Sequence, residues 1–191
     1  MMNADAFGQC SSCNVGGGCF SAASATGDCS FAACDGSAAS GAGAAALAGG
    51  TASGGGSVGL ANGNASGAAA VSIGSNSVAS GVKSHSIGQS SVSGDYAYSF
   101  GKENISAGDC SWTFGEFLRT TSTASHNMVI GHGVYNSSLL LENSISNTIM
   151  IGVNSDVSTV FIGNSGGTSD SYGNVGIGNI TAPASLLHVR D

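Results

Sequence analysis

The chain has 191 residues, of which 32 are Gly and one is Pro, and only 8% are charged. Its formal net charge is −7 and its four basic residues are scattered, which argues against nucleic acid or anionic membranes as partners, because both attract clustered Lys and Arg. The sequence lacks the Gly-X-Y repeat of collagen, and it lacks a run of 18 apolar residues that would predict a membrane-inserted helix.

Five of the six cysteines lie near the N-terminus. They are Cys10, Cys13, Cys19, Cys29 and Cys34. Three interpretations are open for them: disulfides between adjacent repeats or chains, free thiols that act as small core residues, and a metal site. Cys10 and Cys13 have the spacing of a zinc knuckle, but no second Cys or His pair follows them. We therefore predict possible disulfides and no metal.

A short phrase recurs between residues 71 and 115. Each copy has an apolar or aromatic residue (His in one copy), then Ser or Thr, then Ile or Phe, then Gly. We call the Ile or Phe of each copy an anchor, and the anchors are Ile73, Ile87, Phe100 and Phe114. Their residue numbers differ by 14, 13 and 14, a step that is too short for a helical repeat and suits a β-solenoid. We predict one short strand per repeat, with the anchors in the core and the Ser or Thr on the opposite face.

A second periodic feature is a Gly that often follows Ala-Ser, which we call the marker glycine. The markers are Gly27, Gly41, Gly54, Gly67, Gly81, Gly94 and Gly108. Earlier anchors at the same step are Phe7, Phe20, Ala33, Leu47 and Leu60. Two features that share a step of 13 or 14 predict a parallel β-solenoid over residues 1–118. We expect the marker glycines in equivalent tight turns with positive or otherwise restricted φ.

The predicted solenoid becomes aromatic near its end, where Tyr98 and Trp112 stand two residues before their anchors. Because they keep the phase of the core, we predict ordinary core residues rather than a ligand-stacking site. His85 has the same phase and is predicted to be a buried, hydrogen-bonded histidine rather than a catalytic one. A lesser alternative places His132 on a trimer axis, where three copies would hold an ion.

Residues 119–191 keep the strand phrase but lose the fixed step, because the glycines of successive phrases are separated by 21, 11 and 15. Irregular gaps are typical of short strands joined by unequal loops and wound with partner chains. The run Leu139–Leu141 would be exposed on a lone solenoid, so we expect it at an interface. We therefore predict an interwoven trimeric β-stem over 119–191, and a parallel homotrimer for the chain.

The repeat Ser-Ile-Gly to Ala-Ser-Gly at Ser72–Gly81 resembles the head of trimeric autotransporter adhesins, over about residues 20–115. That resemblance implies left-handed parallel β-rolls packed as trimers. Residues 172–178, followed by Pro183 and by Leu-His-Val at 187–189, resemble the segment before the intramolecular chaperone of phage tail fibres and tailspikes, over about residues 145–190. Because residues 1–13 show no secretory signal and no run predicts a membrane anchor, we favour a fibre of the phage type.

These observations predict an all-β structural fibre or adhesin, on a virion or outside the cell, that presents a surface to a cell-surface receptor or glycan. The alternative is a subunit of a self-polymerising extracellular filament that contacts the next subunit. No paired acids, nucleophile elbow or nucleotide loop indicates catalysis or a cofactor, so we do not expect an enzyme.

Overall fold

The computed structural model describes residues 23–34, 36–134, 139–164 and 174–190, and within these ranges every regular element is a β-strand. The earliest anchors, Phe7 and Phe20, and the cysteines Cys10, Cys13 and Cys19 lie outside the described residues. The chain divides into two units, residues 1–93 and 94–191, which are described in turn.

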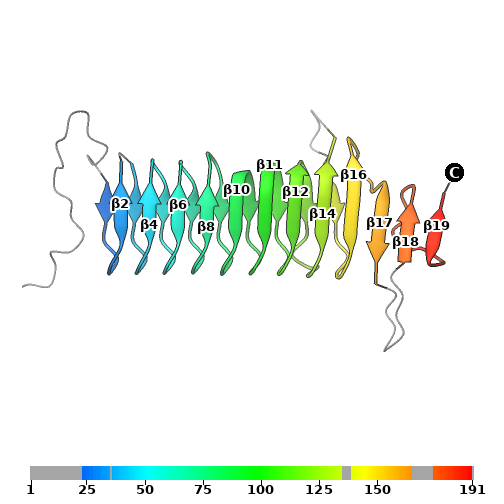
Figure 1. Cartoon of the computed structure of the whole chain (residues 1–191), viewed down its shortest axis with the longest axis horizontal. Coiled ribbons are helices and arrows are strands. Elements are labelled where there is room, and N and C mark those ends of the chain that lie inside the picture. Colours follow the sequence, from blue (N-terminus) through cyan, green and yellow to red (C-terminus); the bar gives the residue numbers. More distant parts are fainter. Residues whose placement is uncertain (1–22, 35, 135–138, 165–173, 191) are drawn as a thin grey trace, which may run out of the picture. The chain divides into compact units, whose positions relative to one another are not determined.

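The first unit is a parallel β-solenoid in which each coil contributes two strands rather than the single strand that was predicted. One wall of the coils contains the anchors, and we call it the anchor wall (Figure 1). Its strands are β2 (Phe31–Ala33), β4 (Ala45–Leu47), β6 (Val58–Leu60), β8 (Val71–Ile73) and the start of β10 (His85–Val92). The other, narrow wall has strands β1 (Ser24–Ala25), β3 (Ala38–Ala39), β5 (Thr51–Ala52), β7 (Asn64–Ala65), β9 (Val78–Ala79) and the end of β10.

The strand register of the first unit confirms the predicted step. On the anchor wall Leu47 pairs with Leu60, Leu60 with Ile73, and Ile73 with Ile87, so successive anchors lie side by side. On the narrow wall Ala52 pairs with Ala65, which is also one step later. All these pairs are parallel, because the chain returns to the same edge of the coil after each turn.

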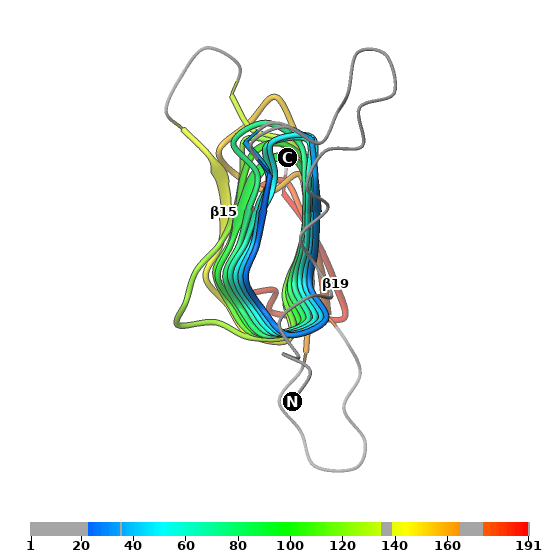
Figure 2. The same ribbon diagram turned by 90° about the vertical axis from the view of Figure 1, so that its left-hand side faces the viewer.

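The two walls face each other across a thin interior (Figure 2), and the largest buried side chain of the first unit's described residues is that of Val92 in its last coil. Ala39, Ala44, Ala46 and Ala52 form one buried cluster, and buried serines fill neighbouring positions. At Gly59 an added Cβ would overlap the backbone oxygen of Thr51 on the narrow wall. Where the backbones approach this closely, no larger residue fits between the walls.

The prediction that the anchors occupy the core is therefore wrong for Leu47, Leu60, Ile73 and Ile87, whereas the small anchor Ala33 is buried. Ser72, between Val71 and the anchor Ile73, is fully buried, whereas both flanking residues are half-exposed. Ile73 and Ile87 thus point out of the coil, and the Ser between each pair points in. The prediction that His85 is buried is wrong for the same reason, because its side chain also lies on the outer face of the anchor wall.

The marker glycines begin equivalent turns, as expected for Gly67 and Gly81, but their φ angles are not positive. The amides of Ala70 and Ser84 donate to the carbonyl oxygens of Gly67 and Gly81, at 3.1 and 3.3 Å. Positive φ occurs two residues after the marker, and it is 54° at both Ala69 and Lys83. The marker must be Gly because coils touch there: a Cβ on Gly67 would overlap the carbonyl group of Gly81.

The second unit continues the same plan over its first strands. Its anchor wall contains β11 (Tyr98–Ser106), β12 (Trp112–Glu116), β14 (Met128–His132) and β16 (Ile149–Val153). Its narrow wall contains the end of β11, β13 (Leu118–Thr120) and β15 (Leu141–Asn143). Within this unit the markers Gly94 and Gly108 approach each other as the earlier markers do, and the anchors Phe100 and Phe114 pair in register.

Parallel coils extend beyond residue 118, where a separate stem was expected to begin. Phe114 pairs with Ile130, and Ile130 pairs with Ile151, so the step lengthens first to 16 and then to 21. The extra residues lie in longer turns, so the coil persists although the step changes. Leu141 is fully buried in this chain's own core with Leu118 and Val129, whereas Leu139 is 51% exposed. Leu141 therefore does not require a partner chain for its burial.

Buried asparagines replace small residues in this wider interior. The Nδ2 of Asn104 donates to the carbonyl oxygens of Phe100 and Gly115, at 3.1 and 2.8 Å, and its Oδ1 accepts a bond from the amide of Leu118. One side chain thus satisfies three backbone groups at a corner where the chain leaves one wall for the other.

The chain changes its mode of pairing after Val153. Strands β17 (Val160–Gly163) and β18 (Asn174–Ile177) pair in antiparallel fashion with β16 and with each other, and β19 (Leu187–Val189) pairs in parallel with β18. The predicted strand phrases of residues 119–191 all form strands. Their winding with partner chains, and the handedness of the coils, stay predictions.

Candidate interaction surface

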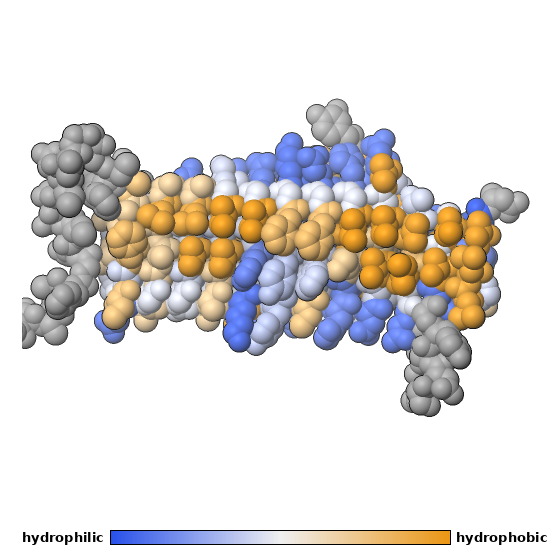
Figure 3. All heavy atoms as spheres, viewed as in Figure 1, coloured by the Kyte–Doolittle hydropathy of each residue, from blue (hydrophilic) through white to orange (hydrophobic). Residues whose placement is uncertain are grey.

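The outer face of the anchor wall in the first unit has two rows of mostly apolar side chains. The first row contains Phe31, Ala45, Val58, Val71 and His85, and the second contains Leu47, Leu60, Ile73 and Ile87, in register with Ala33, which is buried. Neighbours in a row are one coil apart, and Phe31 is 46% exposed. Figure 3 shows apolar residues gathered in lines along this face, with hydrophilic residues interrupting one of the lines.

The second unit carries the same two rows along its anchor wall and along β17, β18 and β19. The first row contains Tyr98, Trp112, Met128, Ile149, Ile162, Val175 and Leu187. The second row contains Phe100, Phe114, Ile130, Ile151, Val160, Ile177 and Val189. These side chains are half-exposed or exposed, and Leu187 and Val189 reach 59% and 58%.

The rows continue through the reversal of strand direction after Val153. The antiparallel partner of Ile149 is Ile162, and the partner of Ile151 is Val160, so a backward strand still places an apolar pair on the outer face. Directly opposite residues on adjacent strands share a face whichever way the strands run. The pairing of β18 and β19 preserves this arrangement.

Aromatic residues concentrate in the first two strands of the second unit. The rings of Phe100 and Phe114 stack with centroids 5.2 Å apart, and Trp112 meets Tyr98 edge to face at 5.5 Å. Beside them a groove of about 630 Å³ runs between the turns and the first row, with Tyr96 and His126 in its lining. The prediction that these aromatic residues belong to the coil's interior is wrong, since Trp112 is 41% exposed.

Charged groups lie beside the second row rather than within it. Lys102, Glu116 and His132 occupy one register position on β11, β12 and β14. The Nε2 of His132 is 3.4 Å from Oε2 of Glu116, and the Nζ of Lys102 lies 5.9 Å from the ring centre of Phe117. This flanking row is of mixed sign, so it carries no strong net charge. The alternative that three copies of His132 hold an ion stays a prediction.

The outer face of the narrow wall is polar by contrast. In the first unit its exposed positions include Ser40, Ser53, Asn64 and Ser66. In the second unit Arg119 and Glu142 form an ion pair of 3.5 Å across β13 and β15. The apolar rows are therefore a property of one wall and not of the whole surface.

The cysteines in the described ranges are free thiols in the single chain. Cys29 and Cys110 both lie two residues after a marker glycine, with φ of 55° and 52°, and Cys34 has φ of 73°. No bond joins Cys29 to Cys34. Because Cys10, Cys13 and Cys19 lie outside the described residues, the expected disulfides stay a prediction. Within those same limits, no three His, Cys, Asp or Glu side chains gather as a metal site would require.

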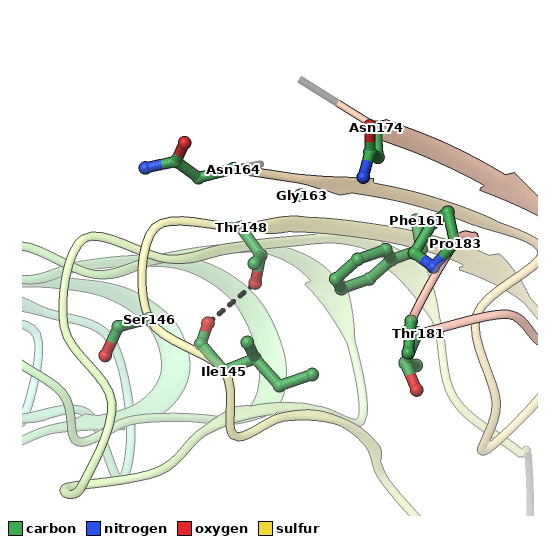
Figure 4. Close-up of a pocket in the computed structure, with 10 residues that line it drawn as sticks. Ile145, Ser146, Thr148, Phe161, Gly163, Asn164, Asn174, Thr181 and Pro183 are labelled. Carbon is green, nitrogen blue, oxygen red and sulfur yellow. Dashed lines mark hydrogen bonds between the residues drawn. The ribbon is translucent and has the colours of Figure 1, made fainter. Parts of the chain in front are cut away.

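A separate cleft lies where the narrow wall ends. It is lined by Ile145, Ser146, Thr148, Phe161, Gly163, Asn164, Asn174, Thr181, Ala182 and Pro183, and its volume is about 280 Å³ (Figure 4). After β15 no further strand of the described chain covers the inner face of β17, so loops at 145–148 and 181–183 cover it instead. Nothing in the repeat pattern predicted this cleft, because it arises where the repeat stops.

Comparison with models of known protein families gives no match to this chain, and no curated protein matches its sequence. None of the described segments forms a helix that could span a membrane.

Proposed function

We propose that the chain is a subunit of a homotrimeric structural fibre, of the phage or phage-like tail-fibre type, that presents a receptor-binding surface outside the cell or on a virion. The observation that carries the proposal is the pair of apolar rows on the outer face of the anchor wall. In each unit these rows persist from strand to strand, and in the second unit they persist across β17, which runs backward.

Such rows are unfavourable on a lone chain. Burying one Leu, Ile or Phe side chain contributes about 1.5–3 kcal/mol relative to leaving it in water. Contiguous apolar surface of this kind marks an interaction site. Because the coil interior of the first unit contains mainly Ala, Ser and Gly, with Val92 in its last coil, most of the large aliphatic side chains of this unit can be buried only by another molecule.

A second and a third copy of the same chain are the partners that the rows fit best. The side chains of a row are spaced one coil apart. The same row on a second copy in parallel orientation has the same spacing, so the two rows can pack along their full length. Cyclic symmetry closes such contacts into a finite assembly, whereas an open arrangement would give a filament. The polar narrow walls would then face outward in three copies, and weak contacts to a receptor would be strengthened by multivalency.

The test is the mass of the native assembly and of two charge variants. The unaltered chain should sediment at about three times 18.4 kDa. Ile73→Asp places a carboxylate in the second row and should leave folded single chains, because Ile73 makes no part of the coil interior. Asn64→Asp adds the same charge on the exposed narrow wall and should remain trimeric.

Three results would count against the proposal: a stable monomer for the unaltered chain, equal behaviour of the two variants, and open-ended polymers that grow with concentration. The last of these would favour the filament alternative.

A further inference from the structure

We propose that the groove beside Trp112 binds a neutral oligosaccharide. This inference rests on the proposed function for its setting and deepens it by naming the chemistry of the receptor. Two ladders of side chains line the groove, and both belong to the second unit. One ladder is the first part of the first row, namely Tyr98, Trp112, Met128 and Ile149. The other, which we call the turn ladder, consists of Tyr96, Cys110, His126 and Asn147.

The turn ladder keeps its register although the step of the coil lengthens. Each of its members stands two residues before a member of the first row, and their φ angles lie between 52° and 60°. The amide of Cys110 donates to the carbonyl oxygen of Asp95 at 2.8 Å, and that of His126 donates to Asp109 at 3.0 Å, so successive turns stack. With four coils at a strand spacing of about 4.8 Å, the groove is about 14 Å long, which suits a linear ligand lying along the ladders.

The aromatic side chains of the groove offer exposed ring surface. Tyr96 and Trp112 are 47% and 41% exposed. Tyr98 and Phe114 contact the indole of Trp112 edge to face, with ring centres 5.5 and 6.1 Å away, so the indole is held in place before a ligand arrives. The C–H face of a pyranose ring packs on exposed aromatic surface of this kind. The volume of about 630 Å³ lies within the range of small-molecule sites.

Two polar side chains further along the turn ladder can bind sugar hydroxyls. His126 and Asn147 are both exposed. The Nδ1 of His126 lies 3.2 Å from the hydroxyl oxygen of Ser125, which leaves Nε2 of the ring for a ligand. The main-chain amide of Asn147 donates to the carbonyl oxygen of Ser125 at 3.0 Å. Its carboxamide offers both a donor and an acceptor, as a sugar hydroxyl does in return.

The charges in and beside the groove argue against other ligands. None of the lining side chains is Asp, Glu, Lys or Arg, so a phosphate group finds no counter-charge. Asp95 and Asp109 stand directly before Tyr96 and Cys110 in the chain, so an acidic sugar would meet two carboxylates. A wholly apolar ligand would displace water from the imidazole and the carboxamide without replacing its hydrogen bonds.

The groove follows the margin of the face that we assign to contacts between chains. Its turn ladder lies outside the two apolar rows, so a chain packed on the rows leaves the turn side of the groove facing solvent. The variants that test the proposal are therefore taken from the turn ladder, which keeps the composition of the rows unchanged.

Peptide-resolved alkylation of Cys110 by iodoacetamide tests the proposal on the intact chain. The neutral probes are maltotriose, cellotriose and chitotriose, with trigalacturonic acid as the charged comparison and a Pro-rich peptide as the comparison of another class, because such peptides also dock in aromatic grooves. At least one neutral probe should bind with a dissociation constant on the order of 1 mM. At about ten times that concentration it should slow the alkylation of Cys110 about tenfold. Cys29 has the equivalent turn position in the first unit and lies outside the groove, so its alkylation in the same sample should not change.

Two substitutions in the turn ladder should weaken the binding. Tyr96→Ala and Asn147→Ala should each raise the dissociation constant about three- to tenfold. Ala is compatible with this backbone, because Ala69 has the equivalent turn position with a φ of 54°. As matched controls, Lys83→Ala removes a long side chain at the same turn position of the first unit, and Asn64→Ala removes an exposed carboxamide there. Neither control should change the protection of Cys110.

Several outcomes would overturn the proposal: no protection of Cys110 by any neutral probe up to about 50 mM, far above the expected constant; equal protection by trigalacturonic acid or by the peptide; or unchanged protection in both turn-ladder variants. If Cys110 is unreactive in the sugar-free assembly but reactive in the Ile73→Asp variant, a partner chain covers the groove, which also overturns the proposal. Sedimentation of the same samples separates this inference from the assembly. A trimer without protection of Cys110 overturns this inference alone, and a monomer with protection overturns only the assembly.

Discussion

At the scale of single residues, the direction of each side chain is what the sequence could not determine. Ser72 and Ile73 alternate as on any half-buried strand, and the usual rule places the apolar residue inside. The rule fails here because the walls approach so closely that only Ser, Ala or Gly fits between them. The alternation of apolar and small polar residues along the strand was therefore predicted correctly. The prediction of which of them faces the interior was reversed.

The glycine that ends each strand phrase should be the least replaceable residue of the second unit. Gly115 has a φ of 136°, and a Cβ there would overlap the carbonyl oxygen of Gly131 on the next coil. Gly115→Ala should lower the free energy of unfolding by about 3 kcal/mol or more, since backbone strain alone accounts for about 1–3 kcal/mol. Urea denaturation followed by circular dichroism measures the change.

Gly43 provides the matched control for that substitution. Its φ of 67° is also positive, but no atom lies within 4 Å of an added Cβ. Asn adopts this backbone region readily, so Gly43→Asn should change the free energy of unfolding by less than about 1 kcal/mol. Equal losses in the two variants would show that φ alone, rather than contact between coils, requires glycine.

At the scale of elements, the step of the coil was predictable but its second strand was not. Anchors and marker glycines each recur with a step of 13 or 14, and the register confirms both patterns within each unit. The strands of the narrow wall in the first unit are short and consist of pairs such as Ala38–Ala39 and Thr51–Ala52. A pair of residues is too short to show the alternation over about four to eight residues that identifies a strand in a sequence.

Removing one whole coil should leave the first unit folded. Val71 pairs with His85, so deletion of Ser72–His85 joins Val71 to Ser86 in the phase that Ser72 had. The stack should become shorter by about 4.8 Å, the distance between adjacent strands, and the chain should keep its oligomeric state. Sedimentation and small-angle X-ray scattering measure these two quantities.

Deletion of half a coil is the control. Without Ser72–Val78, Val71 would be followed by Ala79, and residues of the narrow wall would enter the anchor wall. This variant should lose its β-sheet circular dichroism or aggregate. If both deletions unfold the chain, the coils do not behave as separable repeats.

At the scale of the whole molecule, the sequence indicated exposed apolar surface for partner chains, but most of the residues that form such surface were assigned to the core. Leu141 suggested an interface and is buried in this chain's own core, whereas Leu47, Leu60 and Ile73 were assigned to the core and lie on the outer face. The apolar rows could be found only once strand register was known, because their members are far apart in sequence. The cleft lined by Ile145 and Pro183 could not be found at all, since it depends on where the narrow wall ends.

Truncation after Val153 tests whether the reversing strands direct assembly. The parallel coils up to β16 should still form, because their pairing does not involve β17, β18 or β19. Trimers should be lost, since the most exposed members of the rows, Leu187 and Val189, lie in the removed part and since register between chains is hard to establish without help. A truncated chain that still sediments as a trimer would contradict this assignment.

The corner two residues after each marker glycine has a practical consequence. In the first unit this corner holds Cys29, Gly43, Gly56, Ala69 and Lys83, all with φ between 54° and 67°. Residues as different as Cys, Ala and Lys occupy it, because the position is exposed on every one of these coils. Dyes or cross-linkers attached at any two of these corners would be separated by whole multiples of about 4.8 Å. The first unit can therefore hold labels at known, evenly spaced distances, because the fold tolerates different residues at each of these exposed corners.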